Sequence, residues 1–247
     1  GYAAAQSERG IVLRGMMESL HVDRSRAESL ADAWCLWRSW SRQNWLDCAQ
    51  ESPWISVEKA RSIHAPRIDE CIAEIRSSDS GVILTGWHMG DYLRVFLRSL
   101  LEFPDRRIMI CRRRSPGELE GLMLSRLAAV GLQCEIVVNQ RGAVRKLVDG
   151  LRAGAVAVVM FDLPRVWGKT SLVQFLKGDA HFVIGPAWLA SVSGSTLLAV
   201  GAIEGFSGPE AVTGSNYRRA SSSAASDWIA GVTRSLAAEL AHAVSLT

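Results

Sequence analysis

The sequence predicts an α/β fold, with a mostly parallel central sheet flanked by helices and a helical N-terminal part. Two observations support this. From about residue 78 onward, short apolar segments alternate with amphipathic segments at helical spacing, which is typical of a parallel sheet covered on both faces. The preceding residues show helical spacing without strand-like runs. With 48% hydrophobic and 21% charged residues, the composition is that of an ordinary globular protein.

The N-terminal part, residues 7–76, is predicted to be helical. Residues 24–47 contain no glycine or proline and carry four tryptophans, Trp34, Trp37, Trp40 and Trp45. Such a cluster favours a core or interface role over a lipid anchor, although both readings remain open. Pro53 interrupts the pattern, and residues 57–75 then predict a second helix with a partly solvated face.

The α/β part is predicted from its alternating pattern. Leucine and phenylalanine side chains at positions 93, 96, 97, 100 and 101 define a clean amphipathic helix. The continuous apolar run at 155–162 indicates a strand buried on both faces. We expect strands at 82–85, 106–111, 134–138, 155–162 and 196–205, and helices at 91–103, 117–131, 143–154, 186–194 and 227–244. Loops are expected at 163–185 and in the serine-rich stretch 215–226.

These elements predict one domain over residues 1–247: a helical part (1–77), an α/β core (78–205), and a loop with a C-terminal helix (206–247). The net charge of +3 is too small to indicate a nucleic-acid partner. Five cysteines without a C-x-x-C pair suggest neither a disulfide framework nor a zinc site. We expect a cytoplasmic protein with no metal or bound cofactor, without a signal peptide or membrane-spanning helix, and with at most peripheral membrane contact.

The motif WHMGDY at 87–92 carries the main candidate site. His88 follows the first predicted strand, and ligands in open α/β sheets bind beyond the carboxyl ends of the strands. A histidine there can accept a proton from a hydroxyl or amine, with Asp91 as supporting acid or merely as a helix cap. Trp87 and Gly90 are candidate substrate-contacting positions, since glycine allows close backbone approach. The competing interpretation is a simple turn histidine.

Other candidates follow later strands at the same edge of the sheet. Arg112, Arg113 and Arg114 come after the second strand and are either an anion clamp or a solvated basic edge. Asp162 ends the fourth strand and is a second candidate to orient His88, or a cap for the next loop. No glycine-rich nucleotide motif occurs.

Four blocks in order, GVILTGWHMGDYL, ICRRRSPGEL, RKLVDGLRAGAVAVVMFDLP and FLKGDAHFVIGPAWLASVSGSTLLAV, resemble the late (HtrB-type) lipid A biosynthesis acyltransferases of the lysophospholipid acyltransferase-like superfamily. The resemblance covers roughly residues 60–205. It implies that His88 deprotonates the acceptor, that an apolar channel holds the acyl chain, and that acyl carrier protein or coenzyme A supplies the thioester. Transfer also needs an oxyanion donor, either a backbone amide near Gly90 or an arginine.

The chain departs from that family pattern at the acid. Family members carry a carboxylate five residues after the histidine, where this chain has Leu93. Asp91 lies two residues early, about 200° away on a helix, so Asp91, Asp162 or no acid at all supports His88. The missing membrane-binding start puts the lipid A acceptor in doubt. The resemblance thus implies an acyltransferase acting on a small molecule or a carrier-tethered natural-product intermediate. The alternative is a catalytically silent relative that binds a carrier protein or lipid as a partner subunit.

Overall fold

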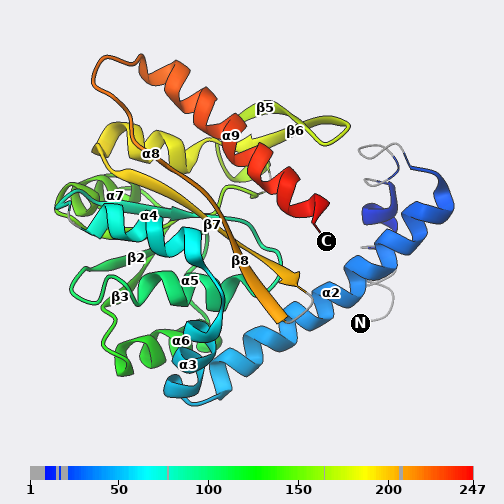
Figure 1. Cartoon of the computed structure of the whole chain (residues 1–247), viewed down its shortest axis with the longest axis horizontal. Helices are drawn as coiled ribbons and strands as arrows, with labels where there is room; N and C mark the ends of the chain where they lie inside the picture. Colours follow the sequence, from blue (N-terminus) through cyan, green and yellow to red (C-terminus); the bar gives the residue numbers. More distant parts are fainter. Residues whose placement is uncertain are drawn as a thin grey trace.

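The central feature of the computed structural model is a six-stranded sheet with the order β3-β2-β4-β1-β7-β8 (Figure 1). The structure describes residues 9–14, 17, 22–76, 78–163, 165–205 and 208–246. The first five strands in this order pair in parallel, and β8 pairs antiparallel to β7. The predicted α/β fold with a mostly parallel sheet is therefore confirmed. The strands are β1 (Val82–Thr85), β2 (Ile108–Arg112), β3 (Cys134–Val138), β4 (Val156–Val158), β7 (Thr196–Gly205) and β8 (Gly208–Tyr217).

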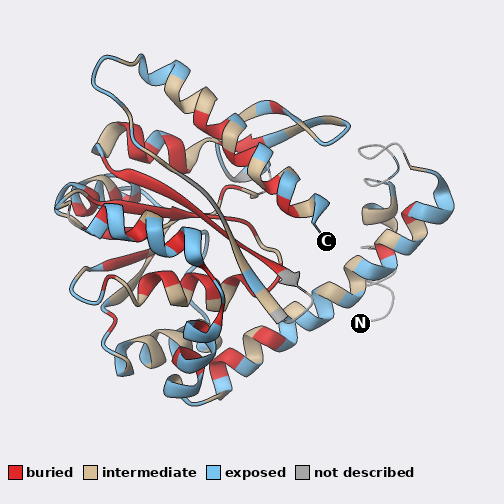
Figure 2. Cartoon of the chain, viewed as in Figure 1, coloured by how far each residue is buried: buried red, intermediate tan, exposed pale blue. Residues whose placement is uncertain are grey.

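Helices cover both faces of this sheet. On one face, α4 (Pro66–Arg76), α5 (Tyr92–Leu100) and α6 (Glu118–Ala129) contribute to a core that includes Ile72, Phe96 and Leu198. On the other face, α7 (Ala143–Arg152), α8 (Gly185–Ser193) and α9 (Ala225–Ser245) pack around Leu151 and Leu236. Figure 2 shows the buried residues concentrated in the central strands and on the inner sides of these helices. Alternate residues of each strand supply the two cores, as expected for a sheet buried on both faces.

The N-terminal part is helical, as predicted, and Figure 1 shows α2 extending as a long helix from the body of the molecule. α2 (Arg24–Gln50) begins at Asp23, whose carboxylate accepts the amide of Arg26. α3 (Pro53–Ser62) has Pro53 in its first turn. The single helix predicted over 57–75 is wrong, because Pro66 separates α3 from α4. The expected start at residues 7 and 8 lies outside the described residues.

A hairpin and one further strand differ from the sequence prediction. Residues 163–185, expected as a loop, contain a 3₁₀ turn (Arg165–Trp167) and an antiparallel hairpin of β5 (Thr170–Phe175) and β6 (Gly178–Val183). β8 replaces the first part of the expected serine-rich loop and closes the sheet edge on β7. Polar and small residues dominate both segments, so neither shows the apolar pattern by which a strand is recognised. Pro164 lies outside the described residues.

Neighbouring parallel strands position the site. β1 pairs with β4 from Val82 opposite Val156 to Leu84 opposite Val158. The ladder continues beyond the assigned strands, because the amide of Val159 donates to Leu84 (3.0 Å) and that of Phe161 to Gly86 (3.3 Å). The residues that follow, His88 and Asp162, therefore emerge side by side at the carboxyl edge of the sheet. None of the helices in the described ranges is long and apolar enough to cross a membrane.

Candidate active site

His88 and Asp162 form a hydrogen-bonded pair. The Nδ1 atom of His88 lies 2.9 Å from Oδ1 and 3.1 Å from Oδ2 of Asp162. The backbone amide of His88 donates to Oδ2 at 2.7 Å, which holds the carboxylate in place. A carboxylate accepts hydrogen bonds, so this geometry suits an imidazole that donates from Nδ1, and in the neutral form of that imidazole Nε2 has a free lone pair. The histidine is thus set up as a base through Nε2.

The burial of the pair suits this role. The His88 side chain is 39% exposed and that of Asp162 19%, so the imidazole reaches the cavity while the carboxylate lies behind it. Tyr92 packs its ring edge-to-face against the imidazole, with centroids 5.1 Å apart. The Tyr92 hydroxyl accepts from Nε1 of Trp45 at 2.7 Å, and burial raises the pKa of Tyr92. The tyrosine is therefore neutral and fixes the plane of the histidine ring.

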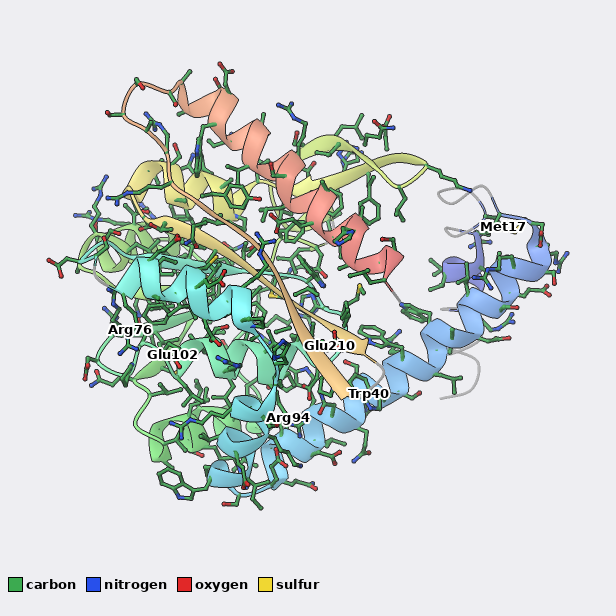
Figure 3. All side chains as sticks on the ribbon, viewed as in Figure 1. Met17, Trp40, Arg76, Arg94, Glu102 and Glu210 are labelled. Atoms are coloured by element: carbon green, nitrogen blue, oxygen red, sulfur yellow. The ribbon has the colours of Figure 1, made fainter. Side chains whose placement is uncertain are left out.

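Asp91, the acid nearest to His88 in sequence, is engaged elsewhere. It is buried (2% exposed) and caps α5 by accepting the amide of Arg94. Its carboxylate also receives the Arg94 guanidinium (2.6 Å) and the Asn44 amide (2.9 Å). Arg94, labelled in Figure 3, in turn bonds Glu51 at 3.1 Å. The Glu51 carboxylate also accepts from Ser56 and Lys59 of α3, so α2, α3 and α5 meet at this cluster. The proposal of Asp91 as the orienting acid is corrected: its lone pairs hold the N-terminal helices, and Asp162 is the partner of His88.

Trp87 and Gly90, expected to contact substrate, are structural instead. Trp87 is 1% exposed and packs edge-on against Phe161 in the core beneath the sheet. Its ring occupies the space above Gly201, where a Cβ atom would come within 2.0 Å. Gly90 has φ +51° and lies against the backbone of Ala202, at 2.9 Å from an added Cβ. Packing accounts for both residues, because Trp87 belongs to the core under α7 and α8 and Gly90 lies against β7.

The three arginines reach the same rim, as predicted. Arg112 is paired with Glu120 at 2.5 Å and lies over the Trp45 ring, 5.9 Å from its centroid. Glu120 also accepts the amide of Gly117 at the start of α6, so Arg112 is held by a rigid partner. Arg113 and Arg114 are exposed on the following loop, and all three arginines line the cavity next to the histidine. The three arginines bring positive charge to this rim, and carboxylates do not outnumber them there.

A cavity of about 1430 Å³ opens at this edge of the sheet. His88, Asp162 and the three arginines lie in its wall together with Lys169, Arg94 and Arg126, and among the lining residues that the structure describes the acids are Glu120 and Asp162. The remaining wall is mainly apolar and comes from α2, α3, α5, α6, α7 and α8 and from strands β2, β3, β4 and β6. Leu93, at the position of the family carboxylate, is part of this apolar wall and packs with the α5 core. The leucine therefore shapes the cavity rather than leaving a gap beside His88.

Two cysteines also line the cavity but are poor nucleophiles. Burial raises the pKa of Cys111 to about 12 and that of Cys48 to about 11, so both thiols are protonated at neutral pH. Within the described ranges, no group of three or more His, Cys, Asp or Glu side chains is placed to hold a metal ion. His88 is the group in this cavity best suited to proton transfer.

Sequence reasoning missed Tyr92, Trp45, Glu120 and Asn44. Tyr92 had a local signal, because it falls four residues after His88 and thus near the same side of the turn that starts α5. Trp45 and Asn44 come from α2, and nothing in the local pattern indicates which helix packs against the His88 turn. Glu120 occupies the third position of α6, where a carboxylate commonly caps the helix start.

The site was compared with known proteins once its geometry was defined. No model of a protein family matches the sequence, and a search of curated proteins finds no match. The chemical interpretation of the cavity therefore depends on the residues described above and on the motif resemblance.

Proposed function

We propose that this protein is an acyltransferase that moves an acyl group from a thioester on acyl carrier protein or coenzyme A to a hydroxyl or amine. The observation that carries the proposal is the His88–Asp162 pair, with the imidazole partly exposed at the wall of a large, mainly apolar cavity. A base of this kind takes part in transfers that need deprotonation of a weak nucleophile. The apolar wall suits an acyl chain, and the motif resemblance points to the same chemistry.

The reaction follows from the positions of the groups. Nε2 of His88 accepts the proton of the acceptor hydroxyl or amine while that heteroatom attacks the thioester carbonyl carbon. Asp162 stabilises the imidazolium that forms. The tetrahedral intermediate collapses, the carbon–sulfur bond breaks, and the imidazolium returns its proton to the leaving thiolate. No covalent enzyme intermediate is required.

The oxyanion and the donor head need positive charge, and arginines provide it. Arg112 is the best candidate near the reacting atoms, because Glu120 and Trp45 fix its guanidinium. Arg113 and Arg114 are exposed at the mouth and suit a phosphate of the pantetheine arm or an acidic carrier surface. We expect the natural acceptor to be a small molecule or a carrier-tethered intermediate, and the reaction to occur in the cytoplasm or at a membrane surface.

The test is discharge of acyl carrier protein loaded with a mixture of acyl chains, followed by mass spectrometry with and without alcohol and amine acceptors. Native protein, His88→Ala and His242→Ala are run side by side; His242 is an exposed histidine on α9 and serves as the matched control. We expect native protein and His242→Ala to discharge the thioester and His88→Ala to fail. Circular dichroism of each variant confirms that it is folded.

Two other results decide against the proposal. Equal discharge by native protein and His88→Ala would mean that the histidine is not the base. Carrier binding without discharge by any of the proteins would favour the alternative function, a silent partner subunit that binds an acylated carrier.

A further inference from the structure

The cavity extends onto both faces of the sheet. Ile110 and Val158 line it and pack with the core under α5 and α6, whereas their neighbours Cys111 and Val159 line it and pack with the core under α7 and α8. Successive residues of a strand point to opposite faces, so one cavity touches two separate cores. The β2–β4 ladder pairs Ile110 with Val158 and closes the direct route between them. His88 and Asp162, at the carboxyl edge of the sheet, lie in the wall of this same cavity.

The part between α5 and α6, here called the inner arm, is a deep apolar slot. It is lined by Leu93, Leu97 and Leu100 along one helix and by Leu127 and Val130 on the other. Leu93 and Leu100 are seven residues apart, which corresponds to about 10 Å along a helix. Leu100 at the far end is only 4% exposed. An apolar slot whose far end is buried suits a flexible hydrocarbon chain that enters end-on.

The part between α7 and α8, here called the outer arm, has a different character. Its floor is buried and formed by Val137, Ala143 and Leu147, while its rim is exposed at Val144 (49%) and Trp188 (37%). Lys169 brings a positive charge to this part of the wall, and its carbonyl accepts the amide of Ile184 at the start of α8. An open apolar groove with a basic edge suits a wider molecule that enters from the side.

We propose that the outer arm is the acceptor site, and that it takes an apolar or aromatic body carrying the reacting hydroxyl and no positive charge. The inner arm then holds the acyl chain at the same time. This inference deepens the proposed function and rests on it for the identity of the reaction. His88, at the junction of the arms, is placed to reach a nucleophile from one side and a thioester carbonyl from the other. Glycerol-like polar acceptors gain nothing from the apolar floor.

Binding can be tested without catalysis. 2-Phenylethanol serves as the acceptor probe and decanoate as an unreactive chain probe, each titrated by isothermal calorimetry alone and in the presence of the other. We expect both to bind together, with either affinity changed less than twofold by the other ligand. Val144→Glu should weaken 2-phenylethanol about tenfold, equivalent to about 1.4 kcal/mol, and leave decanoate unchanged. Val130→Phe should weaken decanoate alone.

The matched control is Leu122→Glu, which places the same charge on an exposed leucine of α6 outside the cavity wall. It should change neither affinity. Mutual exclusion of the two probes, or loss of decanoate rather than 2-phenylethanol in Val144→Glu, would overturn the two-arm assignment. If both probes bind independently but no thioester is discharged, the arms stand and the acyltransferase proposal fails. If the thioester is discharged and the two probes compete, the acyltransferase proposal stands and the two-arm assignment fails.

Discussion

Asp91 and Asp162 are both carboxylates in the neighbourhood of His88, one three residues along the chain and the other 74 residues away. Asp91 is buried among Arg94 and Asn44 and joins three helices, whereas Asp162 is partly exposed and bonds the imidazole. Because Asp91 is buried and its carboxylate is hydrogen-bonded on both oxygens, it contributes to the stability of the fold. Access to the cavity makes the second a group that can act on a ligand. The acid that bonds His88 is therefore not the one nearest to it in the sequence. It is the one that the pairing of neighbouring strands places beside the imidazole.

The largest effect is expected from His88→Ala. Removing the base should lower kcat/KM for acyl transfer by about 10³–10⁴-fold, at the upper end of what general base catalysis contributes. The melting temperature should change little, because the ring is 39% exposed. Steady-state thioester discharge and a thermal melt measure the two quantities. A loss smaller than tenfold would contradict the assignment of the base.

Asp91→Ala should show the opposite pattern, with a large effect on stability. It removes the acceptor of the buried Asn44 amide and one of the two carboxylates that bond the Arg94 guanidinium, and breaking a buried pair costs about 3–5 kcal/mol. Urea unfolding gives the free energy of unfolding. Asp69→Ala is the matched control, because Asp69 pairs with Arg98 at the surface and should cost at most about 1 kcal/mol. Folded Asp91→Ala protein should keep its kcat, and a selective loss of kcat would place Asp91 in the reaction.

Asp162→Asn should reduce activity by about 10²-fold, less than loss of the base itself, because an amide no longer fixes the tautomer or stabilises the imidazolium. The same assay measures it, with exposed Asp105→Asn as control. The double variant Leu93→Glu/Asp162→Asn tests whether an acid at the family position can replace Asp162. The leucine belongs to the cavity wall, so a glutamate there should not restore activity. Recovery to within threefold of native protein would show that the family acid position still serves His88.

Glu51 gives a smaller effect that depends on pH. Its partial burial opposes ionisation, but hydrogen bonds from Lys59, Ser56 and Arg94 outweigh it and lower the pKa of Glu51 below its usual 4.5. A lowered folded-state pKa stabilises the protein above pH 4.5, and this contribution is lost as the pH falls through the folded value. Glu51→Gln should therefore be less stable than native protein at pH 7, with the difference shrinking toward pH 3. Urea unfolding at both pH values checks this, and a constant difference would contradict it.

Much of the α/β core could be predicted because apolar periodicity records burial directly. The run at 155–162 indicated a central strand, and the leucine stripe of α5 indicated the face that packs on it. The β5–β6 hairpin and β8 were not predicted, because half-exposed strands of small and polar residues lack a regular apolar spacing. In the site, His88 and the arginines followed from the rule that parallel strands present their carboxyl ends together. The choice between Asp91 and Asp162 required the strand order, which no local pattern contains.

The continued ladder between β1 and β4 has a consequence for the robustness of the site. Because side chains alternate along a strand, a shift of β4 by one residue relative to β1 would turn Asp162 away from the imidazole and send Phe161 into its place. For the proposed acyltransferase, catalytic competence would thereby depend on the alignment of two central strands that are far apart in the chain. A molecule with collapsed but misaligned strands would retain its helices and most of its hydrophobic burial. It would nevertheless be silent, so activity reports native alignment more sharply than compactness does.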